Sequence, residues 1–340
     1  MSNLDILFPV SLSNSTLSHS CDMKFFRSNI QHLKSSLTNP DLLAGGAFAN
    51  ACELARKAYY NEGLSEEEAI ELGEEFILTS PDTGHSIKTN ERVALTFKKY
   101  IKSFPFTKEF KPCVLADGSH AIEYFFSLDT GIKHPDLPDR NIKYTGLLDG
   151  FYEKSVNGEV IGRYVLDEKT TSRVSRVKGT KEVDLEREAD IFRASSQLIG
   201  YSVAAQRLNN IKITSGLIRR VPIMVKHEPA YELDIPITQF MRDQWEVATY
   251  ERIRELVERY IYYRDNVKDN SSMFPHSVFY PSYGSSCNAY MKMCGYAAGC
   301  LHKQGEKELA MIFDQTVGTM SEDGQRGLTS LAEYKKGLGL

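Results

Sequence analysis

The stretch LLDGFYEKSVNGEVIGRYVLDEKTT, residues 147–171, carries the strongest local signal in the sequence. Strand-like runs lie on both sides of the dipeptide Asn157-Gly158, which favours the two-residue type I′ turn of a β-hairpin. Asp149 lies near the start of the first run, and Asp167 ends the second. The sequence therefore predicts a hairpin whose open end carries two carboxylates from positions far apart in the chain.

Asp149, Asp167 and Lys169 form a pattern suited to phosphodiester hydrolysis. Two carboxylates at the edge of a sheet provide hard oxygen ligands for Mg²⁺ or Mn²⁺, and a nearby ammonium can orient or activate an attacking water. Bound metal would also neutralise charge on the scissile phosphate. The alternative interpretation is that Asp149 is a turn acid and that residues 167–169 are a solvated strand end.

The strand register raises a difficulty for this site. With a two-residue turn, Val156 faces Glu159, so Asp149 falls opposite Leu166 and points to the other face of the sheet from Asp167. One inserted residue would bring both carboxylates to the same face. We therefore predict a β-bulge in one of the two strands, a feature common beside active sites.

A helix downstream offers two further candidates, Gln197 and Tyr201. Apolar positions from Ile191 to Ala205 follow three-residue and four-residue steps and predict an amphipathic helix. Gln197 and Tyr201 are spaced i, i+4, so their side chains lie on one face of that helix. They could face the edge of the sheet, or Tyr201 could be a core residue and Gln197 a boundary residue.

Three segments, in this order along the chain, resemble the signature of RecB-type nucleases of the PD-(D/E)XK superfamily: LLDGFYE, VLDEKTTS and QLIGY. The resemblance implies an α/β fold with a restriction-endonuclease-like mixed sheet flanked by helices. It also implies the following roles: Asp149 and Asp167 as metal ligands, the backbone carbonyl of Glu168 as a further ligand, Lys169 as the catalytic lysine, and Gln197 and Tyr201 as residues that position the lysine and DNA.

Upstream, residues 43–65, LAGGAFANACELARKAYYNEGLS, resemble the Ala-rich helix of the same family. Ala49 stands where many members carry a metal-binding His, and Glu53 follows one helical turn later. Glu53 or a water could replace the missing ligand, metal binding could be weakened, or Glu53 could be an ordinary surface acid of the helix.

Four of the six cysteines suit one Cys₄ centre, because Cys287, Cys294 and Cys300 are clustered and Cys21 is a remote fourth. Spacing alone does not distinguish Zn²⁺ from an iron-sulfur cluster, and buried thiols acting as small hydrophobes are the alternative. Residues 14–26, NSTLSHSCDMKFF, resemble the opening helix of RecB-type nucleases that hold a [4Fe-4S] cluster. The resemblance implies a structural cluster that joins the N-terminal and C-terminal segments. Cys52 and Cys113 are expected in the core.

Contacts with DNA are expected in the basic loop after the second hairpin strand, at Arg173, Arg176 and Lys178. The formal charge of the chain is only -4, so mild acidity does not exclude nucleic acid as a partner. Weaker candidates are Lys98, Lys99, Lys102, Arg219 and Arg220.

The composition, 41% hydrophobic and 25% charged over 340 residues, is that of a globular protein. We expect a nuclease domain over residues 1–304, with its core at about residues 40–265, and a helical tail over residues 305–340. The sequence shows neither a secretory signal nor a segment of the roughly 20 apolar residues that a membrane span needs, so we expect a cytoplasmic protein that binds no membrane.

The resemblance implies a metal-dependent DNA nuclease. An exonuclease that processes single-stranded or duplex ends in recombination, repair or phage replication is the expected form, with a recombination or replication protein as a candidate partner. The alternative is a non-cleaving DNA-binding accessory protein that retains the nuclease fold and the cluster.

Overall fold

The computed structural model describes residues 5–17, 21–34, 40–269, 275–282, 287, 294–301, 309, 313–320 and 326–340. The chain forms two compact units. Unit 1 comprises the described parts of Met1–Leu37, Ser127–Thr145 and Val247–Leu340, and unit 2 comprises Thr38–Phe126 and Gly146–Glu246 where described. Unit 1 is assembled from three segments far apart in the sequence, and the boundary expected at residue 304 stays a prediction.

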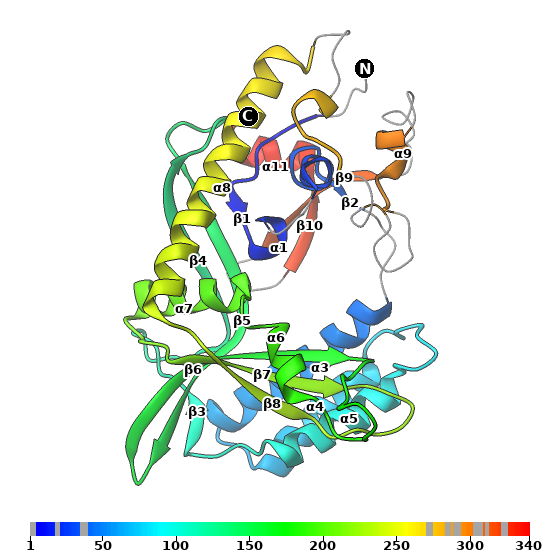
Figure 1. The fold of residues 1–340 in the computed structure, drawn as a ribbon, viewed down its shortest axis with the longest axis vertical. Helices are drawn as coiled ribbons and strands as arrows, with labels where there is room; N and C mark the ends of the chain where they lie inside the picture. Colours follow the sequence, from blue (N-terminus) through cyan, green and yellow to red (C-terminus); the bar gives the residue numbers. More distant parts are fainter. Residues whose placement is uncertain are drawn as a thin grey trace. The chain divides into compact units, whose positions relative to one another are not determined.

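A mixed β-sheet contains the predicted hairpin (Figure 1). In the described ranges it has seven strands in the order β1-β5-β6-β7-β8, and β3 and β4 also pair with β5. Their bounds are β1 (Ser11–Leu12), β3 (Phe110–Pro112), β4 (Ile122–Lys133), β5 (Asn141–Val156), β6 (Glu159–Thr171), β7 (Ser215–Pro222) and β8 (Tyr231–Pro236). β6 is parallel to β7, whereas β5 is antiparallel to β6 and β7 to β8. The predicted mixed α/β architecture is confirmed.

The hairpin of β5 and β6 has the predicted turn and the predicted bulge. Asn157 and Gly158 have φ values of 52° and 84°, as a type I′ turn requires. Lys154 pairs with Gly162, but Ser155 pairs with Val160, so Ile161 is an extra residue in β6. The inserted residue shifts every later pair by one position.

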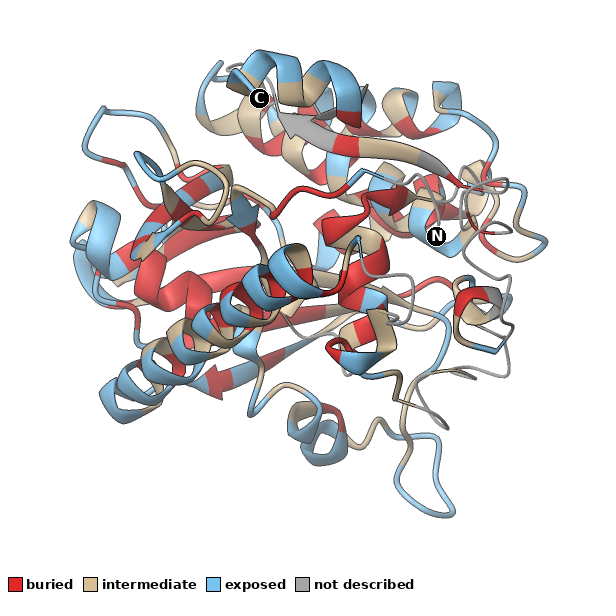
Figure 2. Cartoon of the chain, turned by 90° about the horizontal axis from the view of Figure 1, so that it is seen from above, coloured by how far each residue is buried: buried red, intermediate tan, exposed pale blue. Residues whose placement is uncertain are grey.

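Three helices of unit 2 share one apolar core: α3 (Pro40–Tyr60), α4 (Glu66–Thr79) and α5 (Asn90–Ser103). The Ala-rich sequence predicts one continuous helix over residues 42–72, but the chain turns between α3 and α4. Gly63 adopts a φ of 73°, and Ser65 begins α4 with a capping box to Glu68. Figure 2 shows buried positions concentrated on the inner sides of the helices and on the strands.

Two helices after the hairpin, α6 (Leu185–Asp190) and α7 (Ser196–Asn209), replace the single amphipathic helix expected from Ile191. Ile191 is exposed, and Ser195 begins α7 by accepting a hydrogen bond from the Leu198 backbone N–H. The sequence also predicts a long helix near residues 244–263, and the structure confirms it as α8 (Gln239–Asn266). None of the helices within the described ranges is both long and apolar enough to span a bilayer.

Around an aromatic core that includes Phe8, Phe26, Tyr260 and Phe279, unit 1 packs most of α8, parts of β4 and β5, and a series of short elements. The short elements are α1 (Asn14–Leu17), α2 (Asp22–Phe25), a π-helical turn (Phe26–Ile30), β2 (Leu33–Lys34), a 3-10 turn (Pro275–Ser277), α9 (Ala297–Leu301), β9 (Asp314–Met320), β10 (Arg326–Ser330) and α11 (Leu331–Leu338). Strands β10, β9 and β2 form a second sheet. The helical tail expected after residue 304 therefore contains two strands before its helix, because β9 pairs with the N-terminal strand β2.

Two buried histidines hold the N-terminal segment of unit 1. His32 Nε2 lies 3.0 Å from the carbonyl oxygen of Leu7, and His134 Nε2 lies 2.9 Å from that of Phe8. Burial lowers the pKa of His32 to about 4, and it also lowers the pKa of His134. Both rings are therefore neutral donors in the folded protein at neutral pH.

Replacing His32 with Asn should make the protein less sensitive to acid. The unfolded chain binds a proton at the ordinary histidine pKa near 6.5, whereas the folded chain does so only near 4, so His32 destabilises the fold as pH falls through this window. Over that range the wild type should lose about 3 kcal/mol more unfolding free energy than the variant, measured by urea titration at each pH. Asn is chosen because it tolerates the φ of 54° at this position. If the unfolding free energies of wild type and variant fall in parallel as the pH is lowered, the expectation is contradicted.

Candidate active site

The open end of the β5–β6 hairpin brings Asp149, Asp167 and Lys169 together. The register pairs Gly150 with Leu166, so Asp149 and Asp167 are the next residues on either strand. Lys169 Nζ donates to Asp167 Oδ1 at 2.8 Å, and the Glu168 backbone N–H donates to Asp149 Oδ2. The predicted β-bulge is therefore what brings the two carboxylates to the same face of the sheet.

The electrostatics of this group favour a bound cation. Burial, and then the charge of Asp167, raise the pKa of Asp149 to about 6. Burial opposes the charged form of Lys169, but the two carboxylates overcome this and raise its pKa above the ordinary value. Two carboxylates facing one ammonium leave an excess of negative charge at the site.

Gln197 and Tyr201 of α7 reach the same strand through one chain of hydrogen bonds. Gln197 Nε2 donates to Tyr201 Oη, and Tyr201 Oη donates to the Leu147 carbonyl oxygen, both at 2.7 Å. Burial raises the pKa of Tyr201 to about 12, so the hydroxyl stays protonated. A Cβ at Gly146 would lie 2.6 Å from the Phe126 ring and 3.0 Å from the Tyr201 ring, so a larger residue would clash beside this contact. The pair fixes the backbone two residues before Asp149.

The Glu168 side chain points away from the carboxylate pair, as alternation along a strand requires. It accepts hydrogen bonds from Arg56 of α3 and Tyr100 of α5, and Arg56 Nη1 lies 3.0 Å from Glu168 Oε2. The side chains of Arg56 and Glu168 are only 3% and 1% exposed. The backbone of Glu168 lies at the candidate site, where the observed contact is its N–H to Asp149.

Tyr100 also accepts a hydrogen bond from Arg219 of β7, at 3.3 Å from Nη1. Arg219 lies over the rings of Phe104 and Phe110, at 4.2 and 5.0 Å from their centroids. Sequence reasoning missed this buried network and named Arg219 only as a weak DNA contact. Arg56 on the apolar face of an Ala-rich helix was the available signal, because a buried guanidinium needs a partner.

The region of α3 that resembles the family's metal-binding helix supplies no clear third ligand. Glu53 Oε1 lies 2.6 Å from Lys57 Nζ, in a partly exposed ion pair, and Ala49 has no polar side chain. Across the described parts of the chain, no three His, Cys, Asp or Glu side chains are placed to hold one metal ion. The Asp149–Asp167 pair still fits Mg²⁺, which commonly takes one or two carboxylates and completes its shell with water and phosphate oxygens.

The basic loop after β6 is folded as a small turn and held by acids. Arg176 Nη2 lies 2.7 Å from Glu228 Oε1, and Arg176 also bridges to Val183. The buried carboxylate of Glu188 accepts from the Ser175 backbone N–H at 2.8 Å. Arg173 and Lys178 are exposed, whereas the guanidinium of Arg176 is already engaged in an ion pair.

In unit 1, Cys21 and Cys287 meet at one backbone residue. The Ser282 N–H donates to Cys21 Sγ at 3.3 Å, and Cys287 Sγ donates to the Ser282 carbonyl oxygen at 3.4 Å. The Cys294 N–H donates to the Cys287 carbonyl oxygen at 2.7 Å. Burial raises the pKa of Cys300 to about 11, and the other three thiols act in the same direction. The described residues, these four cysteines included, bring no three such side chains together around one metal ion.

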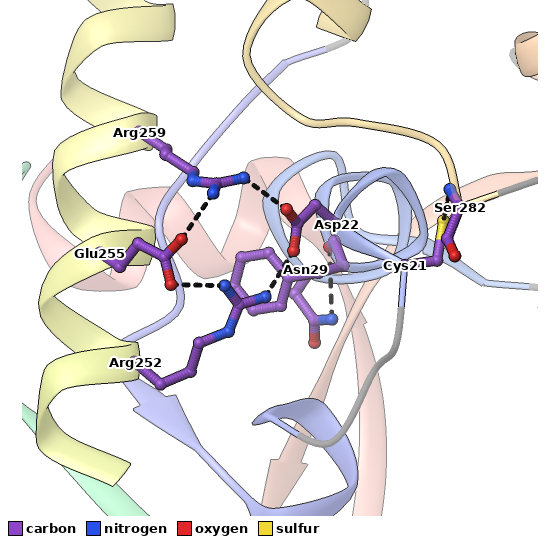
Figure 3. A network of polar contacts seen from close by, with 8 residues as sticks. Cys21, Asp22, Asn29, Arg252, Glu255, Arg259 and Ser282 are labelled. Carbon is purple, nitrogen blue, oxygen red and sulfur yellow. Dashed lines mark hydrogen bonds and ion pairs between the residues drawn. The ribbon is translucent and has the colours of Figure 1, made fainter. Parts of the chain in front are cut away.

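A ring of charges lies beside Cys21 (Figure 3). Asp22 accepts from both Arg252 and Arg259 of α8, and Glu255 accepts from the same two guanidiniums. This ring joins the first turn of α2 to α8 next to the cysteine. Cys52 and Cys113, expected in the core, are 0% and 2% exposed, which confirms that expectation.

No protein-family model matches the chain. No curated protein matches it either. A crystal structure described as "Putative exonuclease" from Eubacterium rectale is similar at 11% identity and a TM-score of 0.40, covering 73% of this chain and 81% of that one. The crystal structure of SSO0001 is similar at 11% identity and a TM-score of 0.24, covering 64% and 84%. At such TM-scores the likenesses carry no weight for activity, so the functional argument rests on the site itself.

Glu168→Gln should destabilise the protein by about 3–5 kcal/mol, because it leaves the buried Arg56 cation without its counter-charge. The double variant Arg56→Met, Glu168→Leu should recover most of this loss. Glu53→Gln, which breaks a partly exposed ion pair, is the matched control and should cost no more than about 1 kcal/mol. Equal unfolding free energies for Glu168→Gln and Glu53→Gln in guanidinium titration would refute the role given to the buried pair.

Proposed function

We propose that the chain is a metal-dependent DNA nuclease, most simply an exonuclease acting on single-stranded or duplex ends. The observation that carries the proposal is the meeting of Asp149, Asp167 and Lys169 at one end of a bulged hairpin. This is the donor set that phosphodiester hydrolysis needs, with hard oxygen ligands on one side and an ammonium on the other. The resemblance of the motifs to RecB-type nucleases supports the choice of DNA as substrate.

In this proposal, Asp149 and Asp167 hold Mg²⁺ or Mn²⁺, which when bound supplies Lewis-acid stabilisation and an activated water. The Glu168 N–H orients Asp149, and the resemblance implies the Glu168 carbonyl oxygen as a further metal ligand. Lys169 keeps its proton beside Asp167 and can hold the attacking water or a phosphate oxygen.

Tyr201 and Gln197 fix the strand that carries Asp149. Arg173 and Lys178 are proposed phosphate contacts on the exposed loop.

We also propose a structural [4Fe-4S] cluster on Cys21, Cys287, Cys294 and Cys300, with Zn²⁺ as the alternative occupant. The resemblance of residues 14–26 to iron-sulfur RecB-type nucleases supports this proposal, as do the contacts that Cys21 and Cys287 both make with Ser282. A cluster here would join segments of unit 1 that are far apart in the sequence. Its proposed role is to stabilise the fold.

A second function has one observation in its favour, which is the absence of a third side-chain ligand at Ala49 and Glu53. A protein that binds DNA without cleaving it would need only the fold and exposed cations such as Arg173 and Lys178. In that case the chain would act as an accessory to another recombination or replication enzyme.

Lys169→Met should reduce Mg²⁺-dependent or Mn²⁺-dependent cleavage of labelled linear DNA by about 100-fold or more, because it removes the ammonium from the reacting centre. Asp149→Asn and Asp167→Asn should have similar effects and should also weaken Mn²⁺ binding in calorimetry. Lys143→Met, which breaks an exposed pair with Asp129, is the matched control and should leave cleavage unchanged. DNA binding without metal-dependent cleavage by the wild type would favour the accessory function.

Anaerobically purified protein should contain iron and acid-labile sulfide in equal amounts, whereas zinc without sulfide would indicate the alternative centre. Cys21→Ser should lose the bound metal and lower the melting temperature, because it removes one of four ligands. Cys113→Ser, a buried cysteine of unit 2, controls for loss of packing and should retain the metal. Protein free of both metals, with an unchanged melting temperature for Cys21→Ser, would refute the cluster.

A further inference from the structure

Unit 2 has a hollow of about 200 Å³ formed by the second half of α7 and the first turns of α8. It is lined by Val203, Gln206, Arg207, Gln239, Arg242 and Glu246. The proposed nuclease site uses none of these residues. The lining is rich in nitrogen donors, and Glu246 is its only acid.

Arg242 is the unusual member of this lining, because it is a cation that is only 4% exposed. Its Nε donates to Ser202 Oγ at 3.2 Å, and its Nη2 donates to the Ile213 carbonyl oxygen. Both acceptors are neutral, and none of the ion pairs among the described residues includes Arg242. A buried cation without a counter-charge is costly, and burial lowers the pKa of Arg242 accordingly.

The position of Arg242 in its helix adds to the excess of positive potential. Arg242 is the fourth residue of α8, and the first turn of this helix contains no acid. The N-terminal end of a helix carries partial positive charge, so it favours an anion and disfavours a cation. Asp243 attracts Arg242 at longer range, but it is exposed and accepts its hydrogen bond from Gln239.

The other charges of the hollow do not compensate for Arg242. Arg207 Nη2 lies 2.7 Å from Glu246 Oε1, so these two side chains neutralise each other and the lining keeps one net positive charge. The amides of Gln206 and Gln239 add neutral donors. Since the lining contains no aromatic ring, the hollow offers nothing on which a base could stack.

We propose that this hollow is an oxyanion site that binds a phosphate group through Arg242. Donors arrive from two helices, which suits the four oxygens of a tetrahedral anion better than the two of a carboxylate. The phosphate belongs either to free inorganic phosphate or to the backbone of a DNA strand. The site does not depend on the proposed nuclease activity.

The test measures binding of inorganic phosphate to the full chain in EDTA, so that the carboxylate site and its metal play no part. Phosphate should raise the melting temperature above that in chloride of equal ionic strength, and calorimetry should show one site. Arg242→Gln should weaken binding about tenfold or more, and Arg207→Gln, at a 53% exposed position, should weaken it less. Arg254→Gln is the control, because Arg254 lies exposed on the same helix in a surface pair with Glu251.

A merely structural Arg242 would give a different pattern, in which Arg242→Gln lowers the melting temperature equally in phosphate and chloride. That result, or a wild type that does not distinguish phosphate from chloride, would overturn the proposal. A short oligodeoxythymidylate distinguishes the two sources. If phosphate competes with the oligonucleotide and Arg242→Gln weakens both, the site takes the DNA backbone, whereas unchanged oligonucleotide binding assigns it to free phosphate.

Discussion

The register of one β-hairpin is the constraint on which the candidate active site depends. Because side chains alternate between the faces of a strand, a two-residue turn alone would place Asp149 and Asp167 on opposite faces. The extra residue Ile161 in β6 shifts the pairing and brings both carboxylates to one edge. Lys169, two residues after Asp167, then lies on the same face by the same alternation. A single inserted residue therefore positions all three groups.

Alternation also explains the buried network on the other side of β6. Glu168 lies between Asp167 and Lys169 and must face the helices, where Arg56 and Tyr100 donate hydrogen bonds to its carboxylate. An ion pair so well buried is strongly destabilised when one partner is lost, so it holds β6 at a fixed position against α3 and α5. Asp167 and Lys169 therefore line the candidate site, whereas Glu168 between them anchors the strand to the helices.

Much of this arrangement could be predicted from the sequence because it is local. The dipeptide Asn157-Gly158 defines the turn, and counting from it exposes the need for a bulge. Features set by long-range packing could not be read in this way. The break at Gly63, the pairing of β9 with β2 and the division into two units depend on contacts between distant segments. The buried role of Arg56 was hidden because its partners come from two other elements, and the contribution of Glu53 stays a prediction.

Diffraction from crystals soaked in Mn²⁺ tests the central claim most directly, because anomalous scattering locates the ion independently of activity. We predict a peak at the open end of the β5–β6 hairpin, coordinated by carboxylate oxygens of both Asp149 and Asp167. A well-ordered site with no peak there, or with the ion bound by only one of the two, would contradict the account.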